Sequence, residues 1–340
     1  MKDYDFGLNW SIKNREIFIN ALKSTCQRMD MTFLWISNDN VREVIKRLER
    51  NEMRVKFLLD TEATYNRDSD PYARVCYAVK DLGGTVINDP DRARLAVDKS
   101  VMHYELVNAG IQTPYSVIVR NWESKSFRLT DEERQKLGSP FVIKPACGYS
   151  RMGVIDEAQG SIREIAQARN FDVGDNFLLQ EKINPVEFKG RRAWFRVFHV
   201  FDKLVPCWWD DRTSWYQHVA HDEFHAYRLS NLVKIVSKIA EITRMVWFST
   251  EIAIDSKDTQ RRFVTIDYVN DQCDMTAQSC DKSGVPDHIV TYVASCIVES
   301  VYKLVHNQER NKEYAIWLHE DDHIQLRGLP TAPELLTQIP

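Results

Sequence analysis

The sequence predicts a mixed protein of α/β and α+β class with two or three subdomains. With 340 residues, the chain is longer than a single hydrophobic core usually supports. In the first hundred residues, apolar segments typical of strands alternate with amphipathic segments typical of helices, which indicates a parallel sheet. Further along the chain, pairs of strand-like segments are joined by short polar turns, which indicates antiparallel hairpins.

The N-terminal part is expected to form a small parallel α/β unit. Its strands are predicted at residues 31–37, 55–59 and 85–88, which are short and largely apolar. Its helices are predicted at residues 40–50 and 71–82, where apolar side chains recur at helical spacing. Because the two kinds of segment alternate, we expect the strands to pair in parallel.

The rest of the chain predicts α+β units and a short tail. We expect helices at residues 98–109, 161–169, 229–243 and 287–304. We expect strands at residues 115–119 and 176–180, a strand–loop–strand segment at 141–155, and hairpins at 194–209 and 251–270, the second turning at 256–259. The charged tail is expected to hold only a short helix near residues 312–318, and the sequence gives it no role.

Charge and composition argue against nucleic acid and membrane as partners. The net charge is -4 and no run of basic residues occurs, whereas a phosphate backbone usually requires a basic face. No stretch approaches the roughly 18 apolar residues that a bilayer-spanning helix needs, and the N-terminus lacks a signal-peptide core. Seven cysteines without CxxC spacing favour reduced thiols. We therefore expect a cytoplasmic protein, and a homodimer is compatible with the sequence.

Lys144 ends an apolar strand and directly precedes a loop of small residues. A lysine at the end of a buried strand is costly unless an anion lies beside it. The loop at residues 146–153 contains Gly148, Ser150 and Gly153, and glycine lets backbone N–H groups approach phosphate oxygens closely. The alternatives are an edge lysine that reaches solvent and an ordinary turn. No Walker A sequence occurs.

Acidic and amide side chains gather on the predicted hairpin at residues 251–270. Glu251 lies on its first strand, and Asp267 and Asn270 lie on its second. Neighbouring strands are about 4.8 Å apart, so side chains from both can meet. Magnesium takes hard oxygen ligands, often one or two carboxylates completed by water and phosphate. Asp255, Asp271 and Asp274 lie near the same strand ends, and this cluster of oxygen ligands predicts a Mg²⁺ site on the hairpin.

The order and spacing of these motifs resemble the ATP-grasp superfamily, in particular its amino-acid ligases, which join a carboxylate to an amine. The most specific part is the string at residues 88–114, with Lys99 near the start of a helix. The resemblance extends from residue 88 to residue 275. It implies an N-terminal Rossmann-like (pre-ATP-grasp) domain at 1–97, a central lid subdomain at 98–185, a C-terminal subdomain with the metal site at 186–310, and a tail at 311–340.

The resemblance also implies roles for individual residues around ATP. Lysines near the phosphates and the flexible loop over them match Lys99, Lys144, Gly148 and Ser150. The adenine hinge and the acid that takes the ribose hydroxyls match Gln180, Glu181, Lys182, Ile183 and Glu187. The alternatives are a solvated lysine at a helix end and a surface strand end with ordinary glutamates.

Two further matches concern the transferred phosphate and the metal. Arg196 matches the arginine that faces the transferred phosphate, and its alternative is a structural ion-pair residue. The aromatic residues that follow it, at 208–216, either line a substrate pocket or pack the core. Glu251, Asp267 and Asn270 match the metal ligands. The match departs from the family pattern because two residues, and not one, separate Asp267 from Asn270. Either a bulge restores the geometry, or Asp271 or Asp255 substitutes as a ligand.

The implied activity is ATP- and Mg²⁺-dependent ligation of a carboxylic acid and an amine through an acyl phosphate, with release of ADP and phosphate. Lys144 and Arg196 would be the catalytic residues, since this chemistry depends on positioning and charge stabilisation. A small-molecule kinase on the same scaffold and a nucleotide-binding regulatory protein without turnover are the alternatives, because fold alone does not determine chemistry. The intact set of candidate residues disfavours the regulatory protein.

Overall fold

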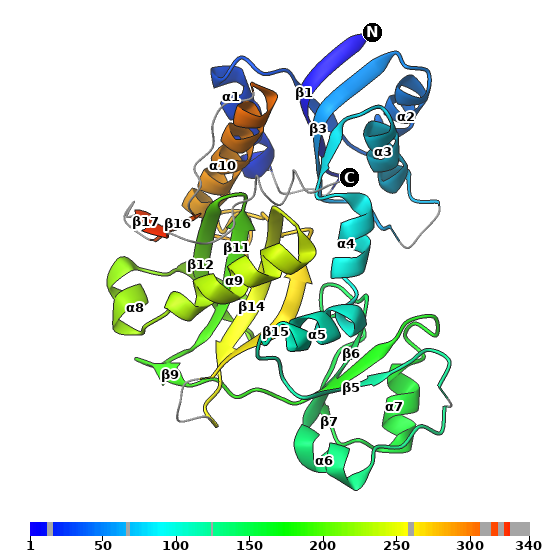
Figure 1. Ribbon diagram of the computed structural model, residues 1–340, viewed down its shortest axis with the longest axis vertical. Coiled ribbons are helices and arrows are strands. Elements are labelled where there is room, and N and C mark those ends of the chain that lie inside the picture. Colours follow the sequence, from blue (N-terminus) through cyan, green and yellow to red (C-terminus); the bar gives the residue numbers. More distant parts are fainter. Residues whose placement is uncertain are drawn as a thin grey trace. The chain divides into compact units, whose positions relative to one another are not determined.

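The computed structural model describes most of the chain, in two compact units (Figure 1). The described residues are 1–11, 16–65, 69–123, 125–257, 262–306, 314–318 and 323–326. The first unit comprises Met1–Arg94, Phe195–Ser249 and Asn270–Pro340, and the second comprises Leu95–Trp194 and Thr250–Val269. The three-domain division expected from the sequence stays a prediction.

The N-terminal segment of the first unit is the predicted parallel α/β structure. Its sheet has the order β2-β1-β3-β4 with all neighbours parallel. The strands are β1 (Lys2–Asn9), β2 (Phe33–Ile36), β3 (Met53–Asp60) and β4 (Thr85–Ile87). The helices are α1 (Glu16–Arg28), α2 (Val41–Glu49) and α3 (Pro71–Asp81).

The first strand and the first helix of this sheet were not among the expected elements. Strand β1 does carry a period-two signal, since Tyr4, Phe6 and Leu8 alternate with other residues. Phe6 and Leu8 are fully buried, and β1 lies between β2 and β3 in the sheet. The sequence therefore carries a period-two signal for the central strand of the sheet.

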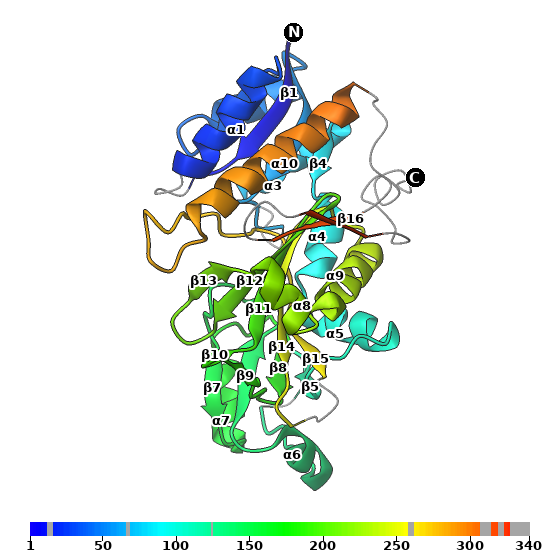
Figure 2. The same ribbon diagram turned by 90° about the vertical axis from the view of Figure 1, so that its left-hand side faces the viewer.

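Helix α10 (Asp287–Val305) packs along α1 in the core of the first unit (Figure 2). It is long and apolar enough to cross a membrane by length and composition alone, contrary to the sequence expectation that no such stretch exists. Ile289, Val293 and Ile297 recur at spacings of four residues and are fully buried. The apolar composition of α10 is thus accounted for by its place in the protein core.

The first unit also contains the antiparallel hairpin that the sequence predicts at residues 194–209. Strands β11 (Trp194–Val200) and β12 (Lys203–Asp210) pair in a register from Phe195–Trp208 to Val200–Lys203. Strand β13 (Trp215–His218) pairs with β12, and α8 (His221–Ala226) and α9 (Ser230–Thr243) follow. Four more strands complete this sheet, namely β14 (Trp247–Ile254), β15 (Phe263–Asn270), β16 (Tyr314–Trp317) and β17 (His323–Leu326), and the order along it is β15-β14-β11-β12-β16-β17.

The expectation of a helix near residues 312–318 was wrong for the part that is described. Tyr314–Trp317 forms strand β16, which pairs in parallel with β12, and His323–Leu326 forms β17, which pairs with β16. Pairing with a distant strand decides the structure here, and a short sequence window does not contain that information. The rest of the predicted tail lies outside the described residues.

The second unit contains a four-stranded antiparallel sheet with the order β5-β8-β6-β7. Its strands are β5 (Ser116–Val119), β6 (Phe141–Pro145), β7 (Ile155–Ala158) and β8 (Phe177–Gln180), and its helices are α5 (Lys99–Asn108), α6 (Asp131–Leu137) and α7 (Ile162–Ala168). Helix α4 (Pro90–Ala96) precedes it, and β9 (Glu187–Phe188) and β10 (Arg191–Arg192) form a small ribbon. Val119, Ile143 and Phe177 are among its core residues.

The predicted hairpin at residues 251–270 corresponds to β14 (Trp247–Ile254) and β15 (Phe263–Asn270). The end of β14 is bonded to the segment after β8, because Ile254 O accepts from Val186 N at 2.8 Å and Ile254 N donates to Ala193 O at 2.9 Å. Part of the predicted turn, residues 258 and 259, lies outside the described residues. From β15, the Tyr268 side chain contacts Gln180 of β8 and Lys144 of β6 in the second unit's sheet.

Candidate functional site

Lys99 is held at the first turn of α5 by the residue before it. The Asp98 carboxylate accepts hydrogen bonds from the backbone of Ser100 at 2.8 Å and of Val101 at 3.3 Å, which caps the helix and fixes where it begins. The Lys99 ammonium donates to Gly148 O at 2.9 Å and lies 3.6 Å from Asp267 Oδ1. The Lys99 side chain therefore contacts the predicted phosphate-binding loop and lies beside Asp267, a predicted metal ligand.

Lys144 is the next-to-last residue of β6 and is 7% exposed. Its ammonium donates to Ile266 O at 2.9 Å. Burial lowers the pKa of Lys144 to about 8. The positive charge of Lys99 lowers this pKa further, whereas the carboxylates of Asp267 and, more weakly, Glu251 raise it. The predicted lysines and carboxylates thus act electrostatically on one another within the second unit.

The loop that follows β6 is fixed at its start and exposed at its tip. Cys147 N donates to the Asp175 carboxylate at 2.8 Å. A Cβ on Gly148 would lie 2.3 Å from Pro145 Cγ, so the chain passes too close to the proline for any other residue. Ser150 is exposed and has a positive φ of 50°. Tyr149 and Ser150 are exposed at the tip of the loop, whereas burial raises the pKa of the Cys147 thiol to about 12, which favours the protonated thiol.

The predicted metal ligands of the second unit lie on the two hairpin strands. Glu251 is half-buried and accepts from the Trp194 indole at 3.1 Å. Asp267 lies beside Lys99, and its backbone carbonyl accepts from Thr250 Oγ1 at 3.0 Å. Among the described residues, no group of three or more histidine, cysteine, aspartate or glutamate side chains is arranged to hold a metal alone. One or two carboxylates suit a magnesium ion that is also bound by phosphate oxygens.

The third predicted metal ligand, Asn270, ends β15 three residues after Asp267. Side chains three residues apart on a regular strand point to opposite faces. Asn270 then shares the side of Tyr268 and not that of Asp267, so its metal role stays a prediction. The substitute Asp255 is fully buried, and its two oxygens accept from Arg262 Nη2 at 2.7 Å and from Lys257 N at 3.1 Å. This ion pair argues against Asp255 as a ligand.

The predicted adenine hinge follows β8, and its first two side chains have partners within the protein. Gln180 Nε2 donates to Ser116 Oγ at 3.2 Å and to Tyr268 Oη at 3.1 Å. Glu181 Oε1 accepts from Lys257 Nζ at 2.8 Å, and its Oε2 lies 3.7 Å from Arg262 Nη2. Both residues are largely buried. Their side chains are used to hold the hinge, which leaves the following backbone as the part of it that is available to a base.

The later hinge residues differ in exposure. Lys182 forms an ion pair with Glu157, and Ile183 is buried. Glu187 is exposed on β9, where it pairs across the ribbon with Arg192. An exposed carboxylate can accept hydrogen bonds from a diol, as the sequence predicts for Glu187. The structure places these residues in the second unit, but their contacts with a nucleotide stay predictions.

Arg196 belongs to the first unit, where aromatic residues hold it. Its Nη1 donates to Tyr216 Oη at 3.0 Å, and its guanidinium carbon lies 4.6 Å from the centre of the Trp209 ring. Such a stacked, hydrogen-bonded guanidinium keeps a fixed orientation. The aromatic cluster at residues 208–216 therefore packs against Arg196 as well as the core.

Asn88 is the first residue of the segment at 88–114 that resembles the ATP-grasp ligases. Its side chain is hydrogen-bonded to the backbone N–H and carbonyl of Trp247 in the first unit.

Tyr268 is a residue of the site that the sequence analysis missed. It is fully buried on β15, directly after Asp267, and touches Gln180, His103 and Lys144. The signal in the sequence was weak, because a tyrosine inside a strand of apolar residues is most often a core residue. Its position next to a candidate metal ligand was the only indication of a role at the site.

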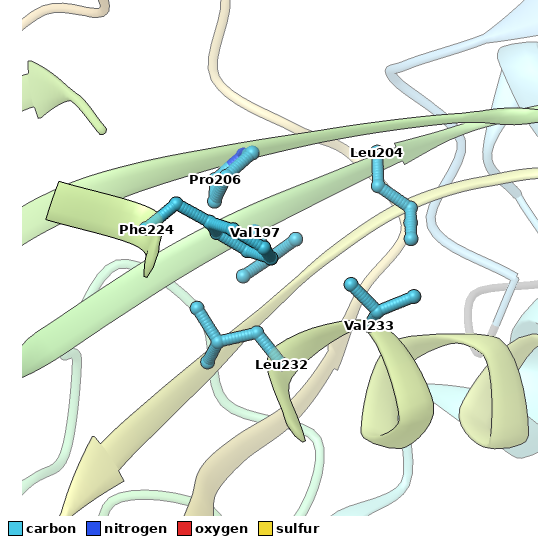
Figure 3. A pocket seen from close by; sticks show the side chains of 6 residues that line it. All are labelled: Val197, Leu204, Pro206, Phe224, Leu232 and Val233. Carbon is cyan, nitrogen blue, oxygen red and sulfur yellow. The ribbon is translucent and has the colours of Figure 1, made fainter. Parts of the chain in front are cut away.

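A pocket elsewhere in the first unit is lined by apolar side chains (Figure 3). It is lined by side chains of β11, β12, α8 and α9, namely Val197, Leu204, Pro206, Phe224, Leu232 and Val233. All six are apolar, and none is a candidate site residue. The pocket cannot supply the charges that a phosphate or a metal ion requires.

These features together define the class of fold. This chain, with a parallel N-terminal sheet, an antiparallel sheet and a strand hairpin in this order, has the same fold as ATP-grasp ligases of solved structure, so the chain has the ATP-grasp fold. This confirms the fold expected from the sequence. Neither a protein-family model nor a curated protein sequence matches the chain.

Three solved structures illustrate the likeness. D-alanine–D-alanine ligase from Bacillus anthracis complexed with ATP has a TM-score of 0.61 at 13% identity, over 91% of this chain and 100% of that chain. D-cycloserine synthetase DcsG has a TM-score of 0.59 at 13% identity, over 87% and 99%. The ATP-grasp ligase PsnB complexed with minimal precursor, Mg and ADP has a TM-score of 0.55 at 9% identity, over 88% and 100%.

Proposed function

We propose that this protein is an ATP- and Mg²⁺-dependent ligase that joins a carboxylic acid to an amine. The observation that carries the proposal is the grouping of two ammonium groups and two carboxylates in the second unit. Lys99 lies 3.6 Å from Asp267, and both Asp267 and Glu251 act on the charge of Lys144. Such a group suits a nucleotide triphosphate, since lysines pair with phosphate oxygens and the carboxylates hold the accompanying cation.

The burial of Lys144 supports the phosphate assignment most directly. In the free protein its ammonium has one backbone acceptor, and burial lowers its pKa to about 8. A neighbouring phosphate anion would favour the charged lysine and satisfy its remaining N–H groups. Lys99 would bind the same phosphates from the start of α5, and the loop at residues 146–153 would cover them with backbone N–H groups.

Glu251 and Asp267 are the residues that would hold Mg²⁺, with Asn270 as the third predicted ligand. The ion supplies charge neutralisation at the β- and γ-phosphates when it is bound. The carboxylates orient the phosphates relative to Lys144. The hinge backbone after Glu181 would bind adenine, and Glu187 would accept hydrogen bonds from the ribose hydroxyls.

In the proposed reaction, a carboxylate oxygen of the substrate attacks the γ-phosphorus, and ADP leaves. The acyl phosphate is then attacked by the amine, which gives an amide and inorganic phosphate. Arg196, fixed by Tyr216 and Trp209, would stabilise charge on the transferred phosphate. The acid and the amine are expected to be small molecules or peptide-like, and the cytoplasm is the proposed location.

Isotope labelling tests the ligase against a kinase on the same scaffold. A panel of amino acids and small acids is first screened for ADP release, and the best acid is then labelled with ¹⁸O in its carboxylate. With ATP, Mg²⁺ and an amine, the ligase releases inorganic phosphate that carries one ¹⁸O atom. A stable phosphorylated product without free phosphate would instead identify a kinase and overturn the ligase proposal.

A further inference from the structure

Tyr268 joins the separate elements of the candidate nucleotide site. It lies on β15 between Asp267 and the strand end, and none of its side chain is exposed. Its ring or hydroxyl contacts residues of α5, β6 and β8, all within the second unit. Each of these elements also carries or precedes a candidate site residue. The contacts of one buried side chain therefore reach most of the site.

The hydroxyl of Tyr268 connects the hinge strand to α5. Gln180 Nε2 donates to Tyr268 Oη at 3.1 Å, and His103 Nδ1 lies 2.8 Å from the same oxygen. Burial, together with the charge of Lys144, lowers the pKa of His103, so its imidazole is neutral at physiological pH. A neutral ring can accept at Nδ1, and the hydroxyl can then accept from Gln180 while it donates to His103.

The partners of the hydroxyl are adjacent to nucleotide-binding candidates. His103 lies four residues after Lys99 on α5, so both side chains project from the same face of the helix. Gln180 ends β8 and directly precedes Glu181, the first acid of the hinge. Loss of the hydroxyl would release both contacts and leave buried polar groups of Gln180 and His103 with fewer partners.

The ring of Tyr268 faces the buried lysine. Lys144 Nζ lies 5.6 Å from the ring centre and donates to Ile266 O, two residues earlier on the same strand. A cation over an aromatic face is attracted to it, and the attraction is stronger where water is excluded. Strand β15 thus holds the ammonium of Lys144 through one carbonyl and one ring.

We propose that Tyr268 is a positioning residue of the nucleotide site, which sets the places of the phosphate-binding lysines and the adenine hinge relative to Asp267. The proposal rests on the proposed function, because it assigns Tyr268 a part in ATP binding. Tyr268 does not touch the reacting atoms. It acts through Lys144, and through the placement of α5 and the hinge.

Two substitutions separate the hydroxyl from the ring. Tyr268→Phe keeps the ring beneath Lys144 and removes the bonds to Gln180 and His103, and we expect the dissociation constant for Mg-ATP to rise about tenfold. Tyr268→Leu also removes the ring, and we expect a rise of about a hundredfold with a lower kcat. The phenylalanine variant should therefore restore part of what the leucine variant loses. The measurements are calorimetric titration with Mg-ATP and the KM for ATP.

The matched control is Tyr65→Phe in the first unit. Tyr65 is partly buried, and its hydroxyl donates to Asp60 Oδ2 at 2.5 Å, so this variant also loses a hydrogen-bonded hydroxyl from the interior. Both phenylalanine variants are expected to lower the Tm, but only Tyr268→Phe should weaken ATP binding. Gln180→Leu should weaken binding as well, and the double variant with Tyr268→Phe should lose less affinity than the sum of the two single effects, because the two side chains share one contact.

The outcomes separate this proposal from the proposed function. A Tyr268→Phe variant that binds Mg-ATP as tightly as the wild type, while its Tm falls as in Tyr65→Phe, would show a purely structural tyrosine and overturn the proposal. A wild-type protein that binds no ATP would overturn the proposed function and this proposal with it. Additive effects of Tyr268→Phe and Gln180→Leu would contradict the link between the hydroxyl and the hinge.

Discussion

Replacement of Lys144 by methionine is expected to stabilise the free protein while it removes nucleotide binding. Burial lowers the pKa of Lys144 from 10.5 to about 8. At about 1.4 kcal/mol per pH unit, keeping this ammonium charged in the fold costs about 3 kcal/mol at pH 7. Methionine fills a similar shape without a charge, but the hydrogen bond to Ile266 O, worth about 1 kcal/mol, is lost. We therefore expect Lys144→Met to raise the free energy of unfolding by about 1 to 2 kcal/mol.

The same residue predicts how stability depends on pH. Because the folded pKa of Lys144 is below its unfolded value, the unfolded chain binds more protons between about pH 8 and pH 10.5. This group therefore makes the wild type more stable as the pH rises through that window, by at most about 1.4 kcal/mol per unit. Lys144→Met lacks this contribution. The difference in the free energy of unfolding between Lys144→Met and the wild type should therefore become smaller between pH 7 and pH 9.5.

Urea unfolding at pH 7 and pH 9.5, with a reducing agent present, measures both effects. The exposed Lys234→Met variant is the control for loss of a surface ammonium, and its free energy of unfolding should change by less than about 0.5 kcal/mol. Calorimetric titration of Lys144→Met with Mg-ATP should show at least a hundredfold loss of affinity. The reasoning is refuted if Lys144→Met is less stable than the wild type at pH 7 and its disadvantage does not change with pH.

Three further predictions concern Gly148, His199 and Asn270. Gly148→Ala brings a methyl group within 2.3 Å of a proline ring carbon and should weaken Mg-ATP binding at least tenfold in calorimetry, whereas Gly174→Ala meets nothing closer than 3.4 Å and should bind normally. Burial lowers the pKa of His199 to about 3, so the unfolded chain binds more protons than the folded protein below pH 6.5. The wild-type free energy of unfolding should therefore fall by up to about 1.4 kcal/mol per pH unit between pH 6.5 and pH 5. His199→Gln should show a smaller fall over this range in urea unfolding. Asn270→Ala should raise the Mg²⁺ concentration needed for half-maximal ADP release; a near-normal Asn270→Ala with a crippled Asp271→Ala would move the metal ligand to Asp271.

The sequence predicted the fold well where the signal is local. The alternation of strands and helices up to residue 88 predicted the parallel sheet, and the pair of strand-like segments at residues 194–209 predicted the β11–β12 hairpin. Lys99 lies 3.6 Å from Asp267, and Asp267 also acts on the charge of Lys144, while the phosphate ligand predicted for both lysines stays a prediction. A lysine at a buried strand end is informative because it needs an anion whatever the rest of the fold is.

The part that could not be predicted depends on contacts between distant residues. Glu181 is paired with Lys257, 76 residues further along the chain, and no local pattern indicates that partnership. Tyr268 looks like a core tyrosine until the partners of its hydroxyl are known. Residues 314–317 form a strand because β12 offers them an edge. In each case a tertiary contact decides the structure or the role of the residue.

Stabilisation by Mg-ATP tests the central claim most directly. Thermal unfolding of the wild type is followed with ATP and Mg²⁺ together and with each alone. A ligand at 100 times its dissociation constant stabilises the folded state by about 2.7 kcal/mol, so the Tm should rise by several degrees, and most when both are present. A Tm that does not change in millimolar ATP and Mg²⁺ would contradict the assignment of Lys99, Lys144 and Asp267 to a nucleotide site.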